Sequence, residues 1–230
     1  MKFQSGTVYH IYNQGNNRQR LFHTPSNYHY FIKQYKRFVN IRADLLGYCL
    51  MPNHFHFLIL TNPLSVKLRK IGTLDLSELS NGIRLMLSAY AAGLNKQLGY
   101  TGSQFRQHTK AKLVPSEDLE YLTNCFHYIH QNPVRAGLTK TEVDWEFSSS
   151  REFSGERDEG ICNLELSRLM TGINERAYRE KTLKLVTDEM IKEFIIPHGG
   201  KVINEAADKT GVSDTGKNTQ KSIEGRMEET

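Results

Sequence analysis

The sequence has few of the residues on which disulfide-rich, zinc-binding and membrane proteins depend. It contains only three cysteines, Cys49, Cys125 and Cys162, and none of them forms a C-x-x-C pair. This argues against a disulfide framework and against a cysteine zinc site. The sequence also lacks any apolar run of about 18 residues, which rules out a membrane-spanning helix, and its first residues lack the apolar stretch of a signal peptide. We therefore expect a cytoplasmic protein without a membrane partner.

Positive charge is concentrated in the first two-thirds of the chain. Residues 1–150 hold 17 Lys and Arg against 9 Asp and Glu, whereas residues 151–230 hold 13 against 16. The net charge is therefore +8 in the first part and −3 in the second. A basic body predicts a polyanionic partner, and nucleic acid is the partner that we expect.

Strands and helices alternate along the first part of the sequence. β-branched and aromatic residues predict four strands, over residues 7–13, 45–51, 54–60 and 105–114. Apolar residues spaced three or four apart predict three helices, over residues 25–39, 74–97 and 116–133. Thr24 and Pro25 are predicted to be the N-cap and the first residue of the first helix, and Pro133 to end or kink the last one.

The order of these elements, β-α-β-β-α-β-α, predicts an α+β fold. It matches a ferredoxin-like antiparallel sheet with helices on one face, and the 11 Tyr and 11 Phe are ample for its core. We assign residues 1–153 to this domain and residues 154–196 to a C-terminal helical extension, with helices over 164–172 and 174–195. Residues 197–230 are polar and are predicted to form a flexible tail.

Two histidines, His54 and His56, alternate along one predicted strand. Alternate side chains of a strand share a face, so both imidazoles point the same way, about two residue rises of 3.3 Å apart, while Phe55 and Phe57 point into the core. Two imidazoles on one face supply half of a metal site, and zinc is one ion that they suit. The alternative is a histidine pair on a solvated strand face. A histidine-triad hydrolase is disfavoured because the third alternate position is Leu58.

The helix predicted to end near Pro133 carries a tyrosine and an asparagine at i and i+4. Tyr128 and Asn132 are therefore neighbours, with about 5–6 Å between their Cβ atoms. If this helix packs against the sheet face with the histidine pair, the Asn132 oxygen completes a His-His-amide site. A phenol is a poor nucleophile unless activated, but it can attack a phosphodiester that a divalent ion polarises. The alternative is a buried aromatic residue followed by a residue that caps the helix.

Taken together, these segments resemble a known family. The matching pieces are residues 9–17 (YHIYNQGNN), 51–56 (MPNHFH), 128–138 (YIHQNPVRAGL) and 145–150 (WEFSSS). They stand in the order found in the REP-associated tyrosine transposases, which are single-tyrosine transposases of the HUH (His-hydrophobic-His) nuclease superfamily. The resemblance covers residues 5–153 and does not extend to residues 154–230.

The resemblance implies a metal-dependent endonuclease and strand transferase that acts on single-stranded or hairpin DNA in transposition and recombination. His54 and His56 match the family's metal ligands, and Asn132 matches its third ligand. Tyr128 matches the tyrosine that attacks DNA, leaving a 5′-phosphotyrosine and a free 3′-OH. Mg²⁺ or Mn²⁺ is the implied ion, because the site must also hold a phosphate oxygen and water. Relatives of this kind imply a monomer or a homodimer.

Further polar and basic residues are candidates for contact with DNA. They lie in the first loop, on the predicted fourth strand and after Pro133, and they are Asn16, Asn17, Arg18, Arg20, Arg106, Lys110, Lys112 and Arg135. Contacts of this kind with phosphates position a strand, while bases are read by loops or by stacking aromatic residues. The alternative for each residue is a solvated surface charge.

Two functions from different classes are open on the residues alone. One is the enzyme described above; replication initiators and relaxases share its chemistry but tend to be larger. The other is a non-catalytic module that binds single-stranded DNA or RNA by stacking bases on sheet aromatics. The pair His54 and His56 suits a metal better than a base, which favours the enzyme. Tyr121, seven residues before Tyr128, is interpreted as a packing residue.

Overall fold

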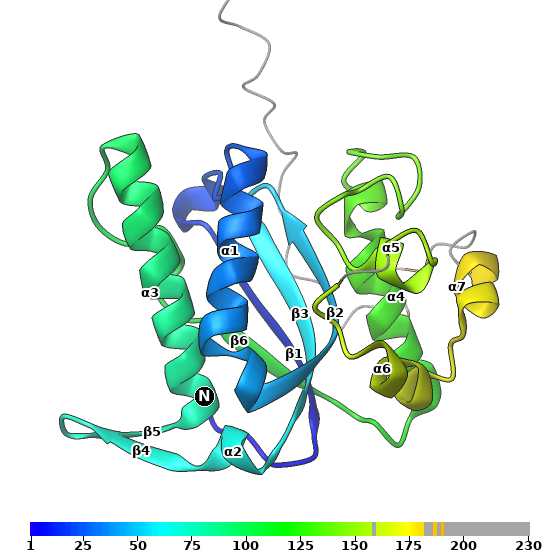
Figure 1. Ribbon diagram of the computed structural model, residues 1–230, viewed down its shortest axis with the longest axis horizontal. Helices are drawn as coiled ribbons and strands as arrows, with labels where there is room; N and C mark the ends of the chain where they lie inside the picture. The colour runs from blue at the N-terminus through cyan, green and yellow to red at the C-terminus, as the bar shows by residue number, and fades with distance from the viewer. Residues whose placement is uncertain (158–159, 182–185, 188–189, 191–230) are drawn as a thin grey trace, which may run out of the picture. The chain divides into compact units, whose positions relative to one another are not determined.

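A four-stranded antiparallel sheet organises the fold (Figure 1). The computed structural model describes residues 1–157, 160–181, 186, 187 and 190. The strands of the sheet are β1 (Val8–Gln14), β2 (Ala43–Met51), β3 (His54–Thr61) and β6 (Lys110–Val114). Their spatial order is β2-β3-β1-β6, which is the order expected of a ferredoxin-like, split β-α-β arrangement. The predicted α+β class is therefore confirmed.

Helices cover both faces of this sheet. α1 (Pro25–Phe38) and α3 (Glu78–Leu98) pack together on one face, and α4 (Leu119–Arg135) packs on the other (Figure 1). The expectation of helices on one face is corrected here. The physical reason is that the central strands are buried on both sides. Phe57 of β3 lies in the core with α1 and α3, whereas its neighbour Leu58 lies in the core with α4.

The other elements are short. They are the 3-10 turns η1 (Asn16–Arg18) and η2 (Asn40–Arg42), the helices α2 (Pro63–Val66), α5 (Ser150–Phe153), α6 (Leu164–Thr171) and α7 (Glu175–Lys181), and the hairpin strands β4 (Leu68–Ile71) and β5 (Leu74–Ser77). The hairpin takes the place of the first turn of the helix predicted over 74–97. That helix begins later because the Ser77 hydroxyl accepts a hydrogen bond from the Ser80 N–H at 3.2 Å and so acts as its N-cap.

The boundaries of α4 also differ from the prediction. The helix was expected from Ser116, but Asp118 is the N-cap, and its carboxylate accepts a hydrogen bond from the Tyr121 N–H at 2.9 Å. Pro133 lies inside the last turn and does not end the helix, which continues for two more residues. Tyr128 and Asn132 therefore lie on one continuous helix.

The described part of the C-terminal extension packs against α4. The helices predicted over 164–172 and 174–195 correspond to α6 and α7. Most of the helix predicted over 174–195 lies, after residue 181, outside the described residues. The tail predicted over 197–230 lies outside them as well. Tyr178 of α7 is fully buried, with its ring centroid 6.1 Å from that of Phe126 on α4. In the part of the chain that the structure describes, no helix is long and apolar enough to cross a membrane.

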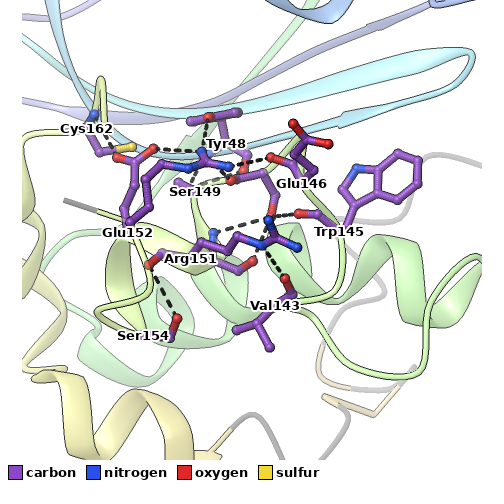
Figure 2. Close-up of polar contacts among 12 residues, drawn as sticks. Tyr48, Val143, Trp145, Glu146, Ser149, Arg151, Glu152, Ser154 and Cys162 are labelled. Carbon is purple, nitrogen blue, oxygen red and sulfur yellow. Dashed lines mark hydrogen bonds and ion pairs between the residues drawn. The ribbon is translucent and has the colours of Figure 1, made fainter. Parts of the chain in front are cut away.

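Residues 145–150 lie along the outer edge of β2, and Figure 2 shows Trp145, Glu146 and Ser149 of this segment with Tyr48 of the strand. The Ser149 N–H donates to the Tyr48 carbonyl oxygen at 3.0 Å, and the Trp145 indole N–H donates to the Leu50 carbonyl oxygen at 2.9 Å. The Ser149 hydroxyl lies 2.7 Å from Nε2 of His130 on α4. The segment thus provides hydrogen-bond partners for backbone groups at the open edge of β2. Through Ser149 it also holds α4 against β2.

A buried carboxyl behind α4 leads to a prediction about stability. Glu142 is 2% exposed, and its Oε2 accepts a hydrogen bond from the Tyr178 hydroxyl at 3.0 Å. Burial raises the pKa of Glu142 from 4.5 to about 7. Between these pH values the folded chain holds a proton that the unfolded chain releases, so the free energy of unfolding falls as the pH rises, in total by ~3 kcal/mol.

Glu142→Gln removes this titration and keeps an oxygen for Tyr178. We expect the variant to be more stable than the wild type at pH 8 and to lose the fall in stability between pH 4.5 and 7. Urea unfolding at a series of pH values measures both effects. Glu165→Gln, at an exposed carboxylate on α6, is the matched control and should leave the profile unchanged. An unchanged profile in Glu142→Gln would contradict the prediction.

Candidate active site

The histidine pair lies on the face of the sheet that α4 covers. His54 and His56 are 4% and 0% exposed, and their ring centroids are 5.0 Å apart with the ring planes at 83°. Phe55 and Phe57 point into the opposite core, as the alternation predicted. The pair is therefore part of the interior, next to α4, and the alternative of a solvated strand face does not describe it.

Asn53 fixes the orientation of the first imidazole. It lies in the tight turn between β2 and β3, in which Met51 pairs with His54. The Asn53 side-chain NH₂ donates to the Arg18 carbonyl oxygen at 3.2 Å, so the other side-chain atom, Oδ1, is the one that faces His54 Nδ1 at 2.6 Å. Because Oδ1 is an acceptor, Nδ1 of His54 carries the proton. If this ring binds a metal ion, Nε2 is then the ligand atom.

His10 of β1 fixes the second imidazole. Its Nε2 lies 2.8 Å from Nδ1 of His56, and the two rings are stacked with centroids 5.1 Å apart. His10 is fully buried, and burial, with a smaller contribution from the charge of Lys112, lowers the pKa of His10 to about 3. His10 is therefore neutral and shares one proton with His56 Nδ1. This arrangement resembles the outer partners that orient metal-binding histidines in proteins.

The sequence prediction missed both of these supporting residues. Asn53 is adjacent to His54, but only the folded turn shows that its oxygen contacts the ring. His10 lies opposite Leu58 in the β1–β3 register, so it is diagonal to His56. A correct guess that these two strands pair, with His10 and Tyr12 on the same face, could have identified it.

Tyr128 of α4 lies against the histidine pair. Its ring centroid is 5.8 Å from that of His56 and 6.3 Å from that of His10, in both cases with the rings nearly perpendicular. The side chain is 2% exposed. The structure therefore brings together Tyr128 and His56, which the sequence placed on separate elements.

Asn132 lies one turn beyond Tyr128 on α4 and is 4% exposed. Its side-chain NH₂ donates to the carbonyl oxygens of Tyr128 at 2.9 Å and of Ile129 at 3.4 Å. Pro133 has no N–H to donate to the Ile129 carbonyl oxygen, so the Asn132 amide supplies this hydrogen bond instead. The amide nitrogen of Asn132 is thus occupied by hydrogen bonds to the helix backbone.

The donor set of the site suits some metal ions better than others. Among the described residues, no cluster of three His, Cys, Asp or Glu side chains is arranged to hold a metal ion. Two imidazoles oriented through Nδ1, with the Asn132 amide oxygen as the expected third ligand, would suit an ion that takes its remaining ligands from water and phosphate oxygens. Mg²⁺ and Mn²⁺ behave in this way, because they keep several water molecules and bind substrate phosphates.

The first loop and the loop before β6 are joined next to the histidine pair. The Asn16 side-chain NH₂ donates to the Ser103 carbonyl oxygen at 2.6 Å, and the Arg106 N–H donates to the Gln14 carbonyl oxygen at 2.9 Å. The strand predicted from residue 105 begins only at Lys110, because the preceding residues form these loop contacts. Five of the predicted DNA-binding residues thus lie on two joined loops: Asn16, Asn17, Arg18, Arg20 and Arg106.

The other predicted DNA-binding residues have different surroundings. Lys110 and Lys112 of β6 pair with Tyr12 and His10 of β1, so both lysines lie on the sheet face that bears the histidines. Arg135 is half-buried at the end of α4, and its guanidinium donates to the Val186 carbonyl oxygen at 3.1 Å, which gives it a structural contact.

Comparison with known proteins gives distant structural likenesses. No family model matches the sequence, and no curated protein matches it significantly. A solved structure of a REP-associated tyrosine transposase bound to a REP hairpin is similar with a TM-score of 0.49 and 17% identity, over 70% of this chain and 87% of that chain. Two structures of a bacterial tRNA(His) guanylyltransferase (Thg1)-like protein, with GTP and with ATP, have TM-scores of 0.37. Their sequence identities to this chain are 12% and 11%. The matches cover 59% of this chain in both cases, and 68% and 61% of the two solved chains.

Proposed function

We propose that the protein is a metal-dependent single-stranded DNA endonuclease and strand transferase that uses Tyr128 as its nucleophile, as in the REP-associated tyrosine transposases that its motifs resemble. The observation that carries the proposal is the packing of the Tyr128 ring 5.8 Å from His56, beside the second imidazole of the pair. The nucleophile of the proposal thus lies in one cluster with two oriented imidazoles. We expect the substrate to be a hairpin with a single-stranded flank.

In this proposal the phenol oxygen of Tyr128 attacks the phosphorus atom. The new bond from tyrosine to phosphorus replaces the bond from phosphorus to the 3′ oxygen. The phenol gives up its proton and the leaving 3′ oxygen takes one up, so the products are a 5′-phosphotyrosine and a free 3′-OH. The energy of the phosphodiester is kept in the linkage, and rejoining to another 3′-OH needs no nucleotide cofactor. This is why one tyrosine is sufficient for both cleavage and strand transfer.

His54, His56 and Asn132 are proposed to hold Mg²⁺ or Mn²⁺. The bound ion supplies polarisation of the phosphoryl oxygen. Asn53 and His10 keep the two imidazoles in fixed orientations through their Nδ1 atoms, so the rings need not be ordered when the ion binds. Asn132 is similarly ordered by its hydrogen bonds to the helix backbone.

The structure offers little support for the alternative of a non-catalytic nucleic-acid-binding module. Such modules stack bases on aromatic residues of an open sheet face. Here α1 and α3 cover one face of the sheet, and α4 covers the other. The aromatic residues of β3, Phe55 and Phe57, are 0% and 2% exposed. They are therefore not available to stack on bases.

The proposed function is tested by a covalent-adduct assay. The full-length chain is incubated with a labelled hairpin oligonucleotide and Mn²⁺, and the mixture is separated on a denaturing gel. A labelled band at the mass of the protein supports the proposal, because only a covalent bond survives denaturation. Absence of such a band across hairpins with varied single-stranded flanks contradicts it.

The proposal also predicts how DNA binding depends on salt. The logarithm of the affinity for single-stranded DNA should fall linearly with the logarithm of the salt concentration, by about 0.7 for each phosphate contact. Arg106→Ala, in the joined loops, should make this slope less steep by about 0.7, which is the value of one phosphate contact. Arg176→Ala, at an exposed arginine paired with Glu180 on α7, is the matched control and should not change it. Equal slopes in all three proteins would remove Arg106 from the interface.

Removing the end of the chain should leave DNA binding unchanged. Residues 197–230 hold five Lys and Arg against six Asp and Glu, so they add no excess of positive charge. We expect a chain ending at residue 196 to show the same salt slope as the full-length chain, measured by fluorescence anisotropy. Loss of binding on truncation would place the DNA contact in these residues instead of the basic body.

A further inference from the structure

Asn53 contacts two parts of the candidate site at once. Its Oδ1 accepts a hydrogen bond from His54 Nδ1 at 2.6 Å, and its NH₂ donates to the Arg18 carbonyl oxygen at 3.2 Å. Its backbone carbonyl oxygen accepts a third hydrogen bond, from the Gly15 N–H at 2.8 Å. One residue therefore links a proposed metal ligand to both ends of the turn η1.

The turn that Asn53 holds has an unfavourable backbone conformation. Asn17 and Arg18 have φ values of 49° and 60°, in the left-handed region that is costly for residues other than glycine. Such a conformation persists where surrounding contacts determine it. The hydrogen bond from Asn53 to the Arg18 carbonyl fixes the peptide that follows Arg18. It thereby sets the direction in which the backbone leaves the turn, beside two exposed side chains that are candidates for DNA contact.

We propose that Asn53 is a positioning residue that sets the geometry of the metal ligand His54 relative to the DNA-contacting turn Asn16–Arg18. The inference rests on the proposed function. The two tasks are performed by different atoms of one amide, since Oδ1 orients the imidazole and Nδ2 holds the turn. An alanine removes both atoms. An aspartate keeps an acceptor for His54 Nδ1–H but has no donor for the Arg18 carbonyl oxygen.

The two substitutions therefore give different expected results. In Asn53→Ala the affinity for Mn²⁺ without DNA should fall about tenfold, as is typical when the partner of a metal-binding histidine is removed. The affinity for hairpin DNA without metal should fall about fivefold, the effect of one lost hydrogen bond. Alanine adds no charge, so this loss is not caused by repulsion of the phosphates. In Asn53→Asp the affinity for Mn²⁺ should return to within about threefold of the wild type, while DNA binding stays weak.

The experiment uses the full-length chain, with Mn²⁺ binding followed by electron paramagnetic resonance and DNA binding by fluorescence anisotropy. Asn62→Ala is the matched control, because Asn62 caps α2 just after β3 and should alter neither affinity. Thermal unfolding identifies any variant that does not fold. If Asn53→Ala is unfolded, Asn53→Asp still decides the question, because loss of Mn²⁺ binding in a folded Asn53→Asp overturns the inference.

His54→Ala, measured alongside, separates this inference from the proposed function. If the wild type binds no Mn²⁺, or His54→Ala binds it as well as the wild type does, the proposed metal site is wrong and the inference falls with it. If His54→Ala loses Mn²⁺ but Asn53→Ala keeps it, only the role of Asn53 is overturned. An unchanged DNA affinity in Asn53→Ala overturns the part of the inference that concerns the turn.

Discussion

Tyr128→Phe is expected to bind hairpin DNA as the wild type does and to form no covalent adduct. The substitution removes one hydroxyl from a ring that packs beside His56 and His10. The ring contacts persist, so we expect the free energy of unfolding to change by only about 1 kcal/mol. Cleavage should fall below detection, because phenylalanine has no oxygen to attack phosphorus. The adduct gel measures cleavage, and fluorescence anisotropy measures binding.

Tyr121→Phe is the matched control for this prediction. Tyr121 lies in the first turn of α4, is half-buried and packs against the same core as Tyr128. The control therefore makes the same chemical change on the same helix, two turns away from the histidine pair. It should keep full adduct formation. If the Tyr128→Phe protein still forms the adduct and Tyr121→Phe does not, the assignment of the nucleophile is wrong and Tyr121 takes its place.

The parts of the site that local sequence determines could be predicted. The alternation of His54 and His56 with Phe55 and Phe57 needs only the two-residue period of a strand. The neighbouring positions of Tyr128 and Asn132 need only the period of a helix. Each pattern fixes the positions of side chains only relative to their own strand or helix. In the structure Phe55 and Phe57 lie in the core, and Tyr128 and Asn132 lie on one helix, as these patterns predict.

The parts that depend on packing between elements could not be predicted. The order of strands and helices along the chain does not determine which face of the sheet α4 covers. In the structure α4 covers the face opposite to α1 and α3. The contact from His10 to His56 depends on the register of β1 against β3. The start of α3 depends on the hairpin β4–β5, whose last residue, Ser77, also caps the helix. In each case the deciding contact joins residues from different elements or from both sides of a boundary.

His54→Ala and His56→Ala are expected to abolish cleavage and to leave hairpin binding nearly intact. The proposal gives the imidazoles a role at the reacting phosphate and gives the exposed loops the role of holding the DNA. Because the imidazoles are buried under α4, their loss removes no exposed group that could contact DNA. Loss of an ion that is worth several kcal/mol to the reaction lowers the rate by about a thousandfold or more. His29→Ala, at an exposed histidine on α1, is the matched control and should cleave normally.

Asn132→Ala should reduce cleavage less than either histidine substitution. An amide oxygen is a weaker ligand than an imidazole nitrogen, and water can partly replace it. The variant also loses the hydrogen bonds to the Tyr128 and Ile129 carbonyl oxygens, so a loss of about 1 kcal/mol in the free energy of unfolding should accompany the change. Rates measured at increasing Mn²⁺ concentrations separate the two effects, because weaker metal binding is overcome by more metal and a lost helix contact is not.

The proposed donor set also predicts which ions support cleavage. Activity should disappear in a chelator and return with Mg²⁺ or Mn²⁺, which accept a mixed shell of nitrogen and oxygen and keep positions for water and phosphate. Zn²⁺ should bind more tightly and inhibit, because it favours a closed four-coordinate site that leaves too few positions for the substrate. Full cleavage in chelator, or normal cleavage by a protein that carries both His54→Ala and His56→Ala, would show that the pair is only a buried polar contact of β3 with α4.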